Sequence, residues 1–143
     1  MPHTFKIPMP LAEKQRQLIA RFAIIDDAHE RLAAIVASGQ RWPEVAEEER
    51  TEARRVPGCV SAVWLTGAVE NGRCHFRISA ASSVVKGLAA LLAALYEGET
   101  PADIIAWEPD LAAALGLDRQ LSPTRLNGLA HIRRAIRDFA SAR

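Results

Sequence analysis

Hydrophobic positions along the chain change their spacing twice, and these changes predict the order of helices and strands. Before residue 60 and after residue 80, apolar residues recur every three or four positions, the period of an amphipathic helix. Between them, two runs rich in β-branched and aromatic residues are typical of strands. The predicted helices cover 11–22, 26–37, 41–55, 82–96, 100–107, 109–117 and 122–143, and the strands cover 60–69 and 73–79. Helices before and after a small antiparallel sheet predict an α+β fold.

A turn joins the two predicted strands at Asn71-Gly72, a pair that strongly favours a β-hairpin between β-rich runs. In this hairpin, which spans 60–79, Cys74 faces Val69 across the two strands. Because side chains alternate along a strand, six apolar residues share one face. They are Val63, Leu65, Val69, Cys74, Phe76 and Ile78. Cys74 is therefore predicted to be a buried core thiol.

Composition and charge are those of one folded domain over 1–143, with an irregular, proline-containing N-terminal arm at 1–10. Apolar residues make up 49% of the chain and charged residues 24%, which favours a globular fold over disorder. The formal net charge of +1 argues against binding to nucleic acid or to a membrane surface. No apolar run is long enough to span a bilayer. The first residues lack the layout of a signal peptide, so a cytoplasmic location is expected.

Cys59 is the most distinctive chemical group, because it follows a Pro57-Gly58 turn at the start of the strand pattern. Arg54 and Arg55 lie just upstream, and nearby positive charge lowers the pKa of a thiol and favours the reactive thiolate. An inert small residue in a loop fits the same pattern. The residues alone leave the reactive and the inert interpretation equally open.

Cys59 and Cys74 are predicted to lie far apart. Cys59 precedes Val69, the partner of Cys74, by ten residues, which is roughly 33 Å along an extended strand. A disulfide needs Cα atoms within about 7 Å of each other, so these two cysteines are not expected to pair. The same separation argues against a metal site built from the two cysteines and His75.

The remaining histidines are expected to face solvent, because two of them lack a nearby partner of catalytic type and the third lies off the apolar face of the last helix. They are His3, His29 and His131. The chain contains no phosphate-binding loop, dinucleotide-binding glycine pattern or nucleophilic serine turn, so no cofactor site is predicted.

Three separate segments carry a recognisable pattern. They are Gly58-Cys59-x-Ser61-x-Val63-Trp64, Val85-Lys86-Gly87-Leu88 and Leu121-Ser122-Pro123-x-Arg125-x-Asn127-Gly128-Leu129. In order and spacing they resemble the signatures of the SufE family, which comprises sulfur-acceptor proteins that work with cysteine desulfurases. The resemblance runs from Phe22 to the terminal helix. It implies one SufE-like domain, an α+β fold with a small antiparallel sheet packed with helices, similar to the IscU scaffold fold.

The resemblance also implies a sulfur-transfer accessory protein rather than a stand-alone enzyme. Cys59 would take persulfide sulfur from a cysteine desulfurase of the SufS or CsdA type, stimulate that enzyme, and pass the sulfur on for iron–sulfur cluster assembly. The receiver would be an iron–sulfur scaffold or another acceptor. Pyridoxal phosphate (PLP) would belong to the desulfurase, so no cofactor or metal is expected on this chain. The oligomeric state, monomer or homodimer, stays open.

Five further residues match the family motifs and are expected to support Cys59. Gly58 and Ser61 flank it. Arg125 implies a cation near the site that tunes the thiol or contacts the desulfurase, with capping or bridging at the start of the last helix as the alternative. Lys86 and Asn127 are assigned to structure first.

The sequence departs from the family pattern beside the thiol. Val60 and Ala62 stand where glutamines are usual, and Ser79-Ala80-Ala81 replaces an acidic stretch. Arg54 occupies the place of an asparagine. These differences leave the choice of partner open. Two other functions stay open as well: an IscU-like metal or cluster scaffold, which needs three or more soft ligands together, and a noncatalytic module that docks on a desulfurase.

Overall fold

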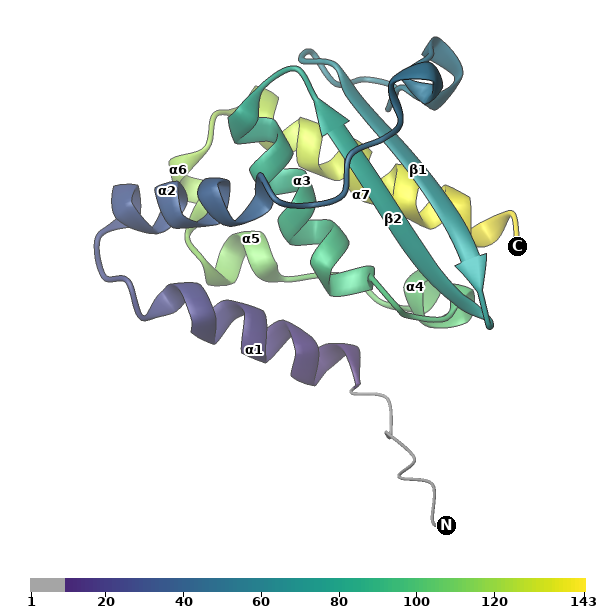
Figure 1. Cartoon of the computed structure of the whole chain (residues 1–143). Coiled ribbons are helices and arrows are strands. Elements are labelled where there is room, and N and C mark those ends of the chain that lie inside the picture. The colour runs from purple at the N-terminus through teal and green to yellow at the C-terminus, as the bar shows by residue number, and fades with distance from the viewer. Residues whose placement is uncertain (1–9) are drawn as a thin grey trace.

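The structure, a computed structural model, describes residues 10–143 and shows the predicted α+β fold. Its helices are α1 (Leu11–Ala23), α2 (Ala28–Gly39), α3 (Ser83–Tyr96), α4 (Pro101–Ala106), α5 (Leu111–Ala114), α6 (Leu117–Gln120) and α7 (Pro123–Ser141). Two antiparallel strands, β1 (Val63–Glu70) and β2 (Arg73–Ala80), form a hairpin across one side of the helices (Figure 1). α3 packs against β2 and α7 against β1. The predicted arm at 1–10 lies, except for Pro10, outside the described residues.

The predicted hairpin register is confirmed, and it determines which side chains enter the core. Cys74 pairs with Val69, and Asn71 and Gly72 make the turn with φ angles of 52° and 75°. A two-residue type I′ turn requires such positive values. Four of the six predicted apolar residues are buried: Val63, Cys74, Phe76 and Ile78. Leu65 is half-buried, and Val69 is 40% exposed because it lies beside the turn at the end of the hairpin.

β1 begins at Val63, three residues later than predicted. Val56 N–H donates a hydrogen bond to the Val63 carbonyl (2.8 Å), and the residue before Val56 forms an isolated bridge with β1. The chain therefore returns alongside the start of the strand. Residues 57–62 leave the sheet as a loop, which is called the thiol loop below.

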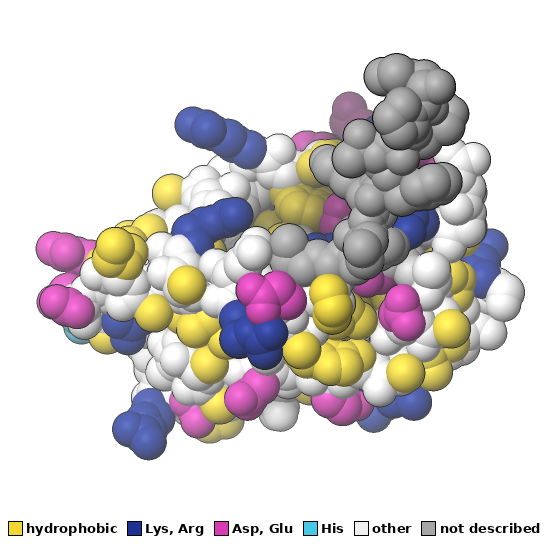
Figure 2. All heavy atoms as spheres, turned by 90° about the horizontal axis from the view of Figure 1, so that it is seen from below, with side chains coloured by type: hydrophobic (Ala, Val, Ile, Leu, Met, Phe, Trp, Pro, Cys, Tyr) yellow, Lys and Arg dark blue, Asp and Glu magenta, His cyan; other side chains and the backbone are white. Residues whose placement is uncertain are grey.

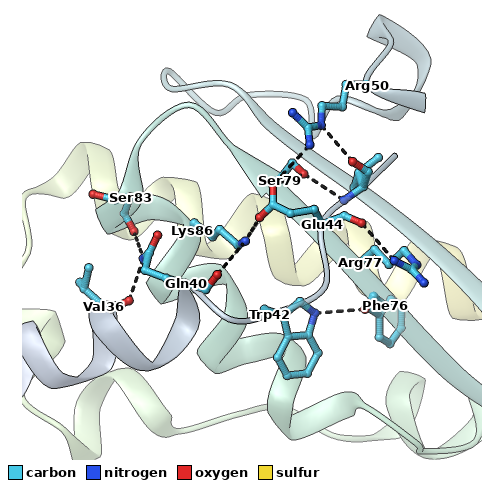
Figure 3. A network of polar contacts seen from close by, with 11 residues as sticks. Val36, Gln40, Trp42, Glu44, Arg50, Phe76, Arg77, Ser79, Ser83 and Lys86 are labelled. Carbon is cyan, nitrogen blue, oxygen red and sulfur yellow. Dashed lines mark hydrogen bonds and ion pairs between the residues drawn. The ribbon is translucent and has the colours of Figure 1, made fainter. Parts of the chain in front are cut away.

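The helix predicted over 41–55 is wrong. The segment holds only two short 3-10 turns, η1 (Glu47–Glu49) and η2 (Glu52–Arg54). Its residues 42–45 run along the edge of β2 and are called the β2 segment below. Ile78 N–H donates to the Pro43 carbonyl of this segment (2.9 Å). Trp42 Nε1–H donates to the Phe76 carbonyl (3.0 Å; Figure 3). These bonds satisfy strand groups that would otherwise stay unpaired, which favours the extended form over a helix.

α3 is the central helix of the fold, and most of its residues are buried. Ser82 caps its start, where the Val85 N–H donates to the Ser82 hydroxyl (3.3 Å). α2 crosses α3 closely at Gly87. A Cβ added there would lie 2.5 Å from the Cα of Val36, so the crossing depends on the missing side chain.

The other helices follow the predicted order with altered bounds. The helix predicted over 109–117 is shorter, α5, and ends before Gly116, which adopts a φ of 72°. α6, which follows Gly116, lies mostly beyond the predicted range and was not predicted. α7 buries three apolar residues, Ile132, Ile136 and Ala140. Phe139 on the same helix lies over Gly67 and meets Phe76 edge-on, with ring centroids 5.5 Å apart. α7 is thereby fixed beneath β1.

The surface carries charges of both signs. On the face seen in Figure 2, acidic and basic side chains are interspersed with hydrophobic ones. No helix within residues 10–143 is both long enough and apolar enough to cross a bilayer.

Candidate functional site

The thiol loop is fastened at both ends. At its start, Val56 N–H bonds to Val63 as described, and at its end Ala81 N–H donates to the Ala62 carbonyl (2.9 Å). Gly58 adopts a φ of 83°, a left-handed conformation that glycine adopts at little cost. The loop therefore reverses direction within a few residues and carries Cys59 to the first half of α7.

The Cys59 thiol turns inward. Its Sγ lies 3.7 Å from the Gly128 carbonyl of α7, at the distance of a weak sulfur hydrogen bond, and the residue is half-buried. A Cβ added at Gly128 would lie 4.0 Å from Sγ, so the helix backbone itself forms one wall around the sulfur.

A cavity of about 280 Å³ adjoins the thiol. Its walls are mostly aliphatic side chains of α3 and α7, and its rim carries hydroxyl groups and one guanidinium. The lining residues are Cys59, Val60, Ser61, Ser82, Val85, Leu88, Ser122, Thr124, Arg125, Gly128, Leu129 and Ile132. The site can therefore hold a sulfur atom in mainly apolar surroundings.

Burial raises the pKa of the Cys59 thiol above its ordinary value, and the positive charge of Arg55 lowers it by less. The expectation that the upstream arginines leave a lowered pKa is therefore wrong for this conformation. Desolvation disfavours the thiolate, and both arginines are partly neutralised by acids. Arg55 lies 3.6 Å from Glu52, and Arg54 lies 3.7 Å from Glu49. With the loop in this position, Cys59 is mainly the neutral thiol at pH 7.

Cys74 is the buried core thiol that the hairpin register predicts. It belongs to the hydrophobic core, and burial raises its pKa. Both cysteines are free. Within residues 10–143, no three His, Cys, Asp or Glu side chains lie close enough together to hold a metal ion.

The structure brings three of the predicted site residues to one cavity: Cys59, Ser61 and Arg125. Arg125 is exposed in the first turn of α7, and its backbone N–H donates to the Ser122 hydroxyl (3.2 Å). Its side chain therefore lies at the rim of the cavity. That it tunes the thiol or contacts a desulfurase remains a prediction. Gly58 lies in the thiol loop beside Cys59.

Lys86 and Asn127 lie apart from the thiol. Lys86 is only 6% exposed, donates from Nζ to the Gln40 carbonyl (3.2 Å), and forms an ion pair with Glu44 (Figure 3). Glu44 also accepts a hydrogen bond from the Ser79 hydroxyl (2.8 Å). Lys86 therefore connects α3 to the segment along β2. Asn127 is exposed on α7 and does not line the cavity.

The residues that depart from the family pattern take different positions. Val60 lies at the tip of the thiol loop and is 81% exposed. Ala62 lies at the base of the loop, bonded to Ala81. Ser79 is buried and, besides bonding Glu44, accepts a hydrogen bond from the Val45 N–H (2.9 Å). Of these residues, Val60 is the one that a partner would meet first.

His131 was expected to face solvent, and this prediction is wrong. The residue is half-buried, and its ring lies against Gly58 of the thiol loop. It stands three residues after Gly128, which places both on the same face of α7. That spacing is visible in the sequence, but nothing in the sequence shows that the thiol loop docks on this face.

Comparison with known proteins gives a consistent result. Residues 16–140 match the SufE family, described as the Fe-S metabolism associated domain. An uncharacterised SufE-like protein of Rhizobium etli is 35% identical over 132 residues, covering 89% of each chain. The sulfur acceptor protein CsdE of Escherichia coli is 34% identical over 117 residues, covering 80% of each.

A solved structure shows the same fold. The solution structure of a hypothetical protein from Thermus thermophilus matches with a TM-score of 0.74 and 22% identity, and the match covers 90% of this chain and 94% of that one. The family match spans most of the chain and includes every predicted site residue, from the thiol loop to α7. The chain therefore belongs to the SufE family.

Proposed function

We propose that this protein is a sulfur acceptor and carrier that takes persulfide sulfur from a PLP-dependent cysteine desulfurase onto Cys59. The observation that carries the proposal is the position of Cys59, in a loop fastened at both ends and beside a mostly apolar cavity. Membership of the SufE family supports it, as does the likeness to CsdE, which is named a sulfur acceptor protein.

The proposed transfer follows thiol–disulfide exchange. The Cys59 thiolate attacks the outer sulfur of a persulfide on the donor enzyme. A new sulfur–sulfur bond forms on Cys59 while the sulfur–sulfur bond on the donor breaks. The donor cysteine leaves as a thiolate and takes up the proton that Cys59 released, so no external oxidant or reductant is needed.

The thiol loop has to open for this attack. In the described conformation Cys59 faces the Gly128 carbonyl, and burial favours its neutral form. Turning the side chain outward would expose Sγ to the donor and remove the desolvation that raises its pKa. After transfer, a return to the cavity would surround the persulfide with the aliphatic side chains of α3 and α7 and limit its contact with water.

The proposal assigns the cofactor chemistry to the donor. PLP would remain in the desulfurase, which this protein would stimulate by removing sulfur from it. The Cys59 persulfide would then pass its outer sulfur, by the same exchange, to an iron–sulfur assembly scaffold or to another thiol acceptor.

Incubation with L-cysteine and a cysteine desulfurase, followed by intact-protein and peptide mass spectrometry, tests this proposal. One added sulfur atom is expected on Cys59 alone. The Cys59→Ser variant should accept none and should lose stimulation of the desulfurase, whereas Cys74→Ser should retain most of both. Sulfur accepted by the Cys59→Ser variant would contradict the proposal.

One observation favours a second candidate, a noncatalytic module that docks on a desulfurase. Val60 presents an exposed apolar side chain at the loop tip, and such a residue can anchor an interface without any chemistry. Normal stimulation of the desulfurase by Cys59→Ser would favour this candidate. Tightly bound zinc or iron in the purified protein would instead favour the cluster scaffold.

A further inference from the structure

Two consecutive residues of the thiol loop rest on one face of α7. Cys59 Sγ lies against the Gly128 carbonyl, and Gly58 lies against the ring of His131. Gly128 and His131 are three residues apart, so they are neighbours on the helix surface. The loop thus docks on α7 at two adjacent points.

The contact between Gly58 and His131 is close. A Cβ added at Gly58 would lie between 2.7 and 2.9 Å from three atoms of the imidazole ring. The ring therefore occupies the space that a side chain at this position would need. Gly58 has no side chain to intervene, so the imidazole packs directly on the loop backbone just before the thiol.

Besides these contacts and the packing of the half-buried Cys59 side chain against the core, little holds the middle of the thiol loop. Within residues 10–143, no backbone hydrogen bond fastens residues 58–61, and the loop is tied by the bonds at its two ends. The bond from Cys59 Sγ is long, at 3.7 Å, and a thiol is a weak donor. Val60 is mostly exposed and adds little packing. The His131 ring is thus a principal packing contact at the centre of the loop.

We propose that His131 is a positioning residue for Cys59: its ring holds the thiol loop closed on α7 and so limits how often the thiol becomes available. This inference deepens the proposed function, because the loop must open before Cys59 can meet a persulfide. The contact that carries it is a property of this chain alone and needs no partner. It can therefore be tested without a desulfurase.

The test is the rate at which iodoacetamide alkylates Cys59 in the folded protein, measured in a Cys74→Ser background. His131→Ala should raise this rate about tenfold, which corresponds to about 1.4 kcal/mol of lost closed-state stability. His131→Phe, which retains a flat ring, should keep the rate near that of the parent. Arg137→Ala is the matched control, since Arg137 is an exposed residue of the same helix whose guanidinium lies 3.7 Å from Glu108, and its rate should not change.

A second readout separates loop opening from a general loss of stability. An open loop no longer desolvates the thiol, so the midpoint of the alkylation rate against pH should move down in His131→Ala. Thermal unfolding should show that the variant stays folded at the assay temperature. An unchanged rate in His131→Ala, or equally fast rates in the Ala and Phe variants, would overturn the positioning role. Failure of Cys59 to accept sulfur would overturn the proposed function and leave the alkylation result standing.

Discussion

The two irregular segments that border the hairpin are held in opposite ways. The segment along β2 is bonded to the strand edge at successive positions, whereas the middle of the thiol loop beside β1 is held by side-chain contacts. Both segments are short, lack regular structure and come from the same stretch of chain between α2 and β1. The difference between them lies in where their backbone polar groups are bonded.

The edge of β2 is bonded along its length, partly by the segment before β1 and partly by the residues that follow α3. Its outward N–H groups at Cys74, Phe76 and Ile78 donate to Glu99, Glu97 and Pro43 respectively, each at 2.9 Å. A strand edge covered in this way is rigid and closed to further pairing. The thiol loop, by contrast, can open without breaking any backbone hydrogen bond between its fastened ends. The loop that can open most easily is therefore the one that carries Cys59, the residue that the proposed function requires to meet a partner.

Lys86→Ala is expected to have the largest effect on the free energy of unfolding, because it removes a buried side chain that holds the β2 segment in place. The variant loses the ion pair to Glu44 and the bond to the Gln40 carbonyl. Glu44 is about half exposed, so we expect a loss of about 2 kcal/mol in the free energy of unfolding rather than the larger value of a fully buried pair. Urea denaturation measures it.

The informative part of that experiment is what should stay the same. Lys86 does not contact the thiol loop, so the rate of Cys59 alkylation under native conditions should match that of the parent. Lys86→Met, which keeps most of the aliphatic stem, should lose less stability than Lys86→Ala. A change in the alkylation rate of the folded Lys86→Ala variant would show that the two segments are coupled.

Gly58→Ala is expected to change the free energy of unfolding less than Lys86→Ala does, and to change the alkylation rate of Cys59 more. The new Cβ would meet the His131 ring. The alanine would also have to keep the left-handed φ of 83°, which costs about 1–2 kcal/mol in a residue other than glycine. Opening the loop relieves both, so the cost should appear mainly as loop opening. We expect Cys59 alkylation to accelerate several-fold, with little change in the urea midpoint. A matched Gly72→Ala change, at a turn with open space around it, should leave alkylation unchanged.

The sequence predicted the parts of this fold that depend on local rules. Asn71-Gly72 determines its own turn, the turn determines the register, and the register buries Cys74. The serine caps of α3 and α7 are local in the same sense. The two largest failures, in the segments before β1, come from competition with distant partners. Residues 41–55 have the composition of a helix, but their first residues bond to β2. The N-terminal part of the strand predicted from residue 60 instead forms the thiol loop.

In the candidate site, too, the features that depend on local sequence could be predicted and those that depend on distant contacts could not. Cys59 could be singled out from its turn, which neighbouring residues determine, and from the family resemblance, which three short motifs carry. Its raised pKa could not, since it depends on burial against α7, and the arginines that suggested a lowered pKa are paired with Glu49 and Glu52. His131 could not be found either, because its role depends on a contact 73 positions away in the chain, at Gly58.

The smallest predicted effect concerns the charge of Arg55. Its guanidinium lowers the pKa of Cys59 against the larger opposing effect of burial, so Arg55→Ala should raise that pKa further and reduce the thiolate fraction at neutral pH. Because Arg55 is partly exposed and its charge is screened, we expect alkylation near pH 7 to slow by only about twofold. Glu52→Gln, which frees Arg55 from its acidic neighbour, should change the rate in the opposite direction. A rate that falls in both variants would mean that the ion pair holds the loop in shape. A rate that falls in Arg55→Ala and rises in Glu52→Gln would mean that the thiol responds to charge even while the loop is closed.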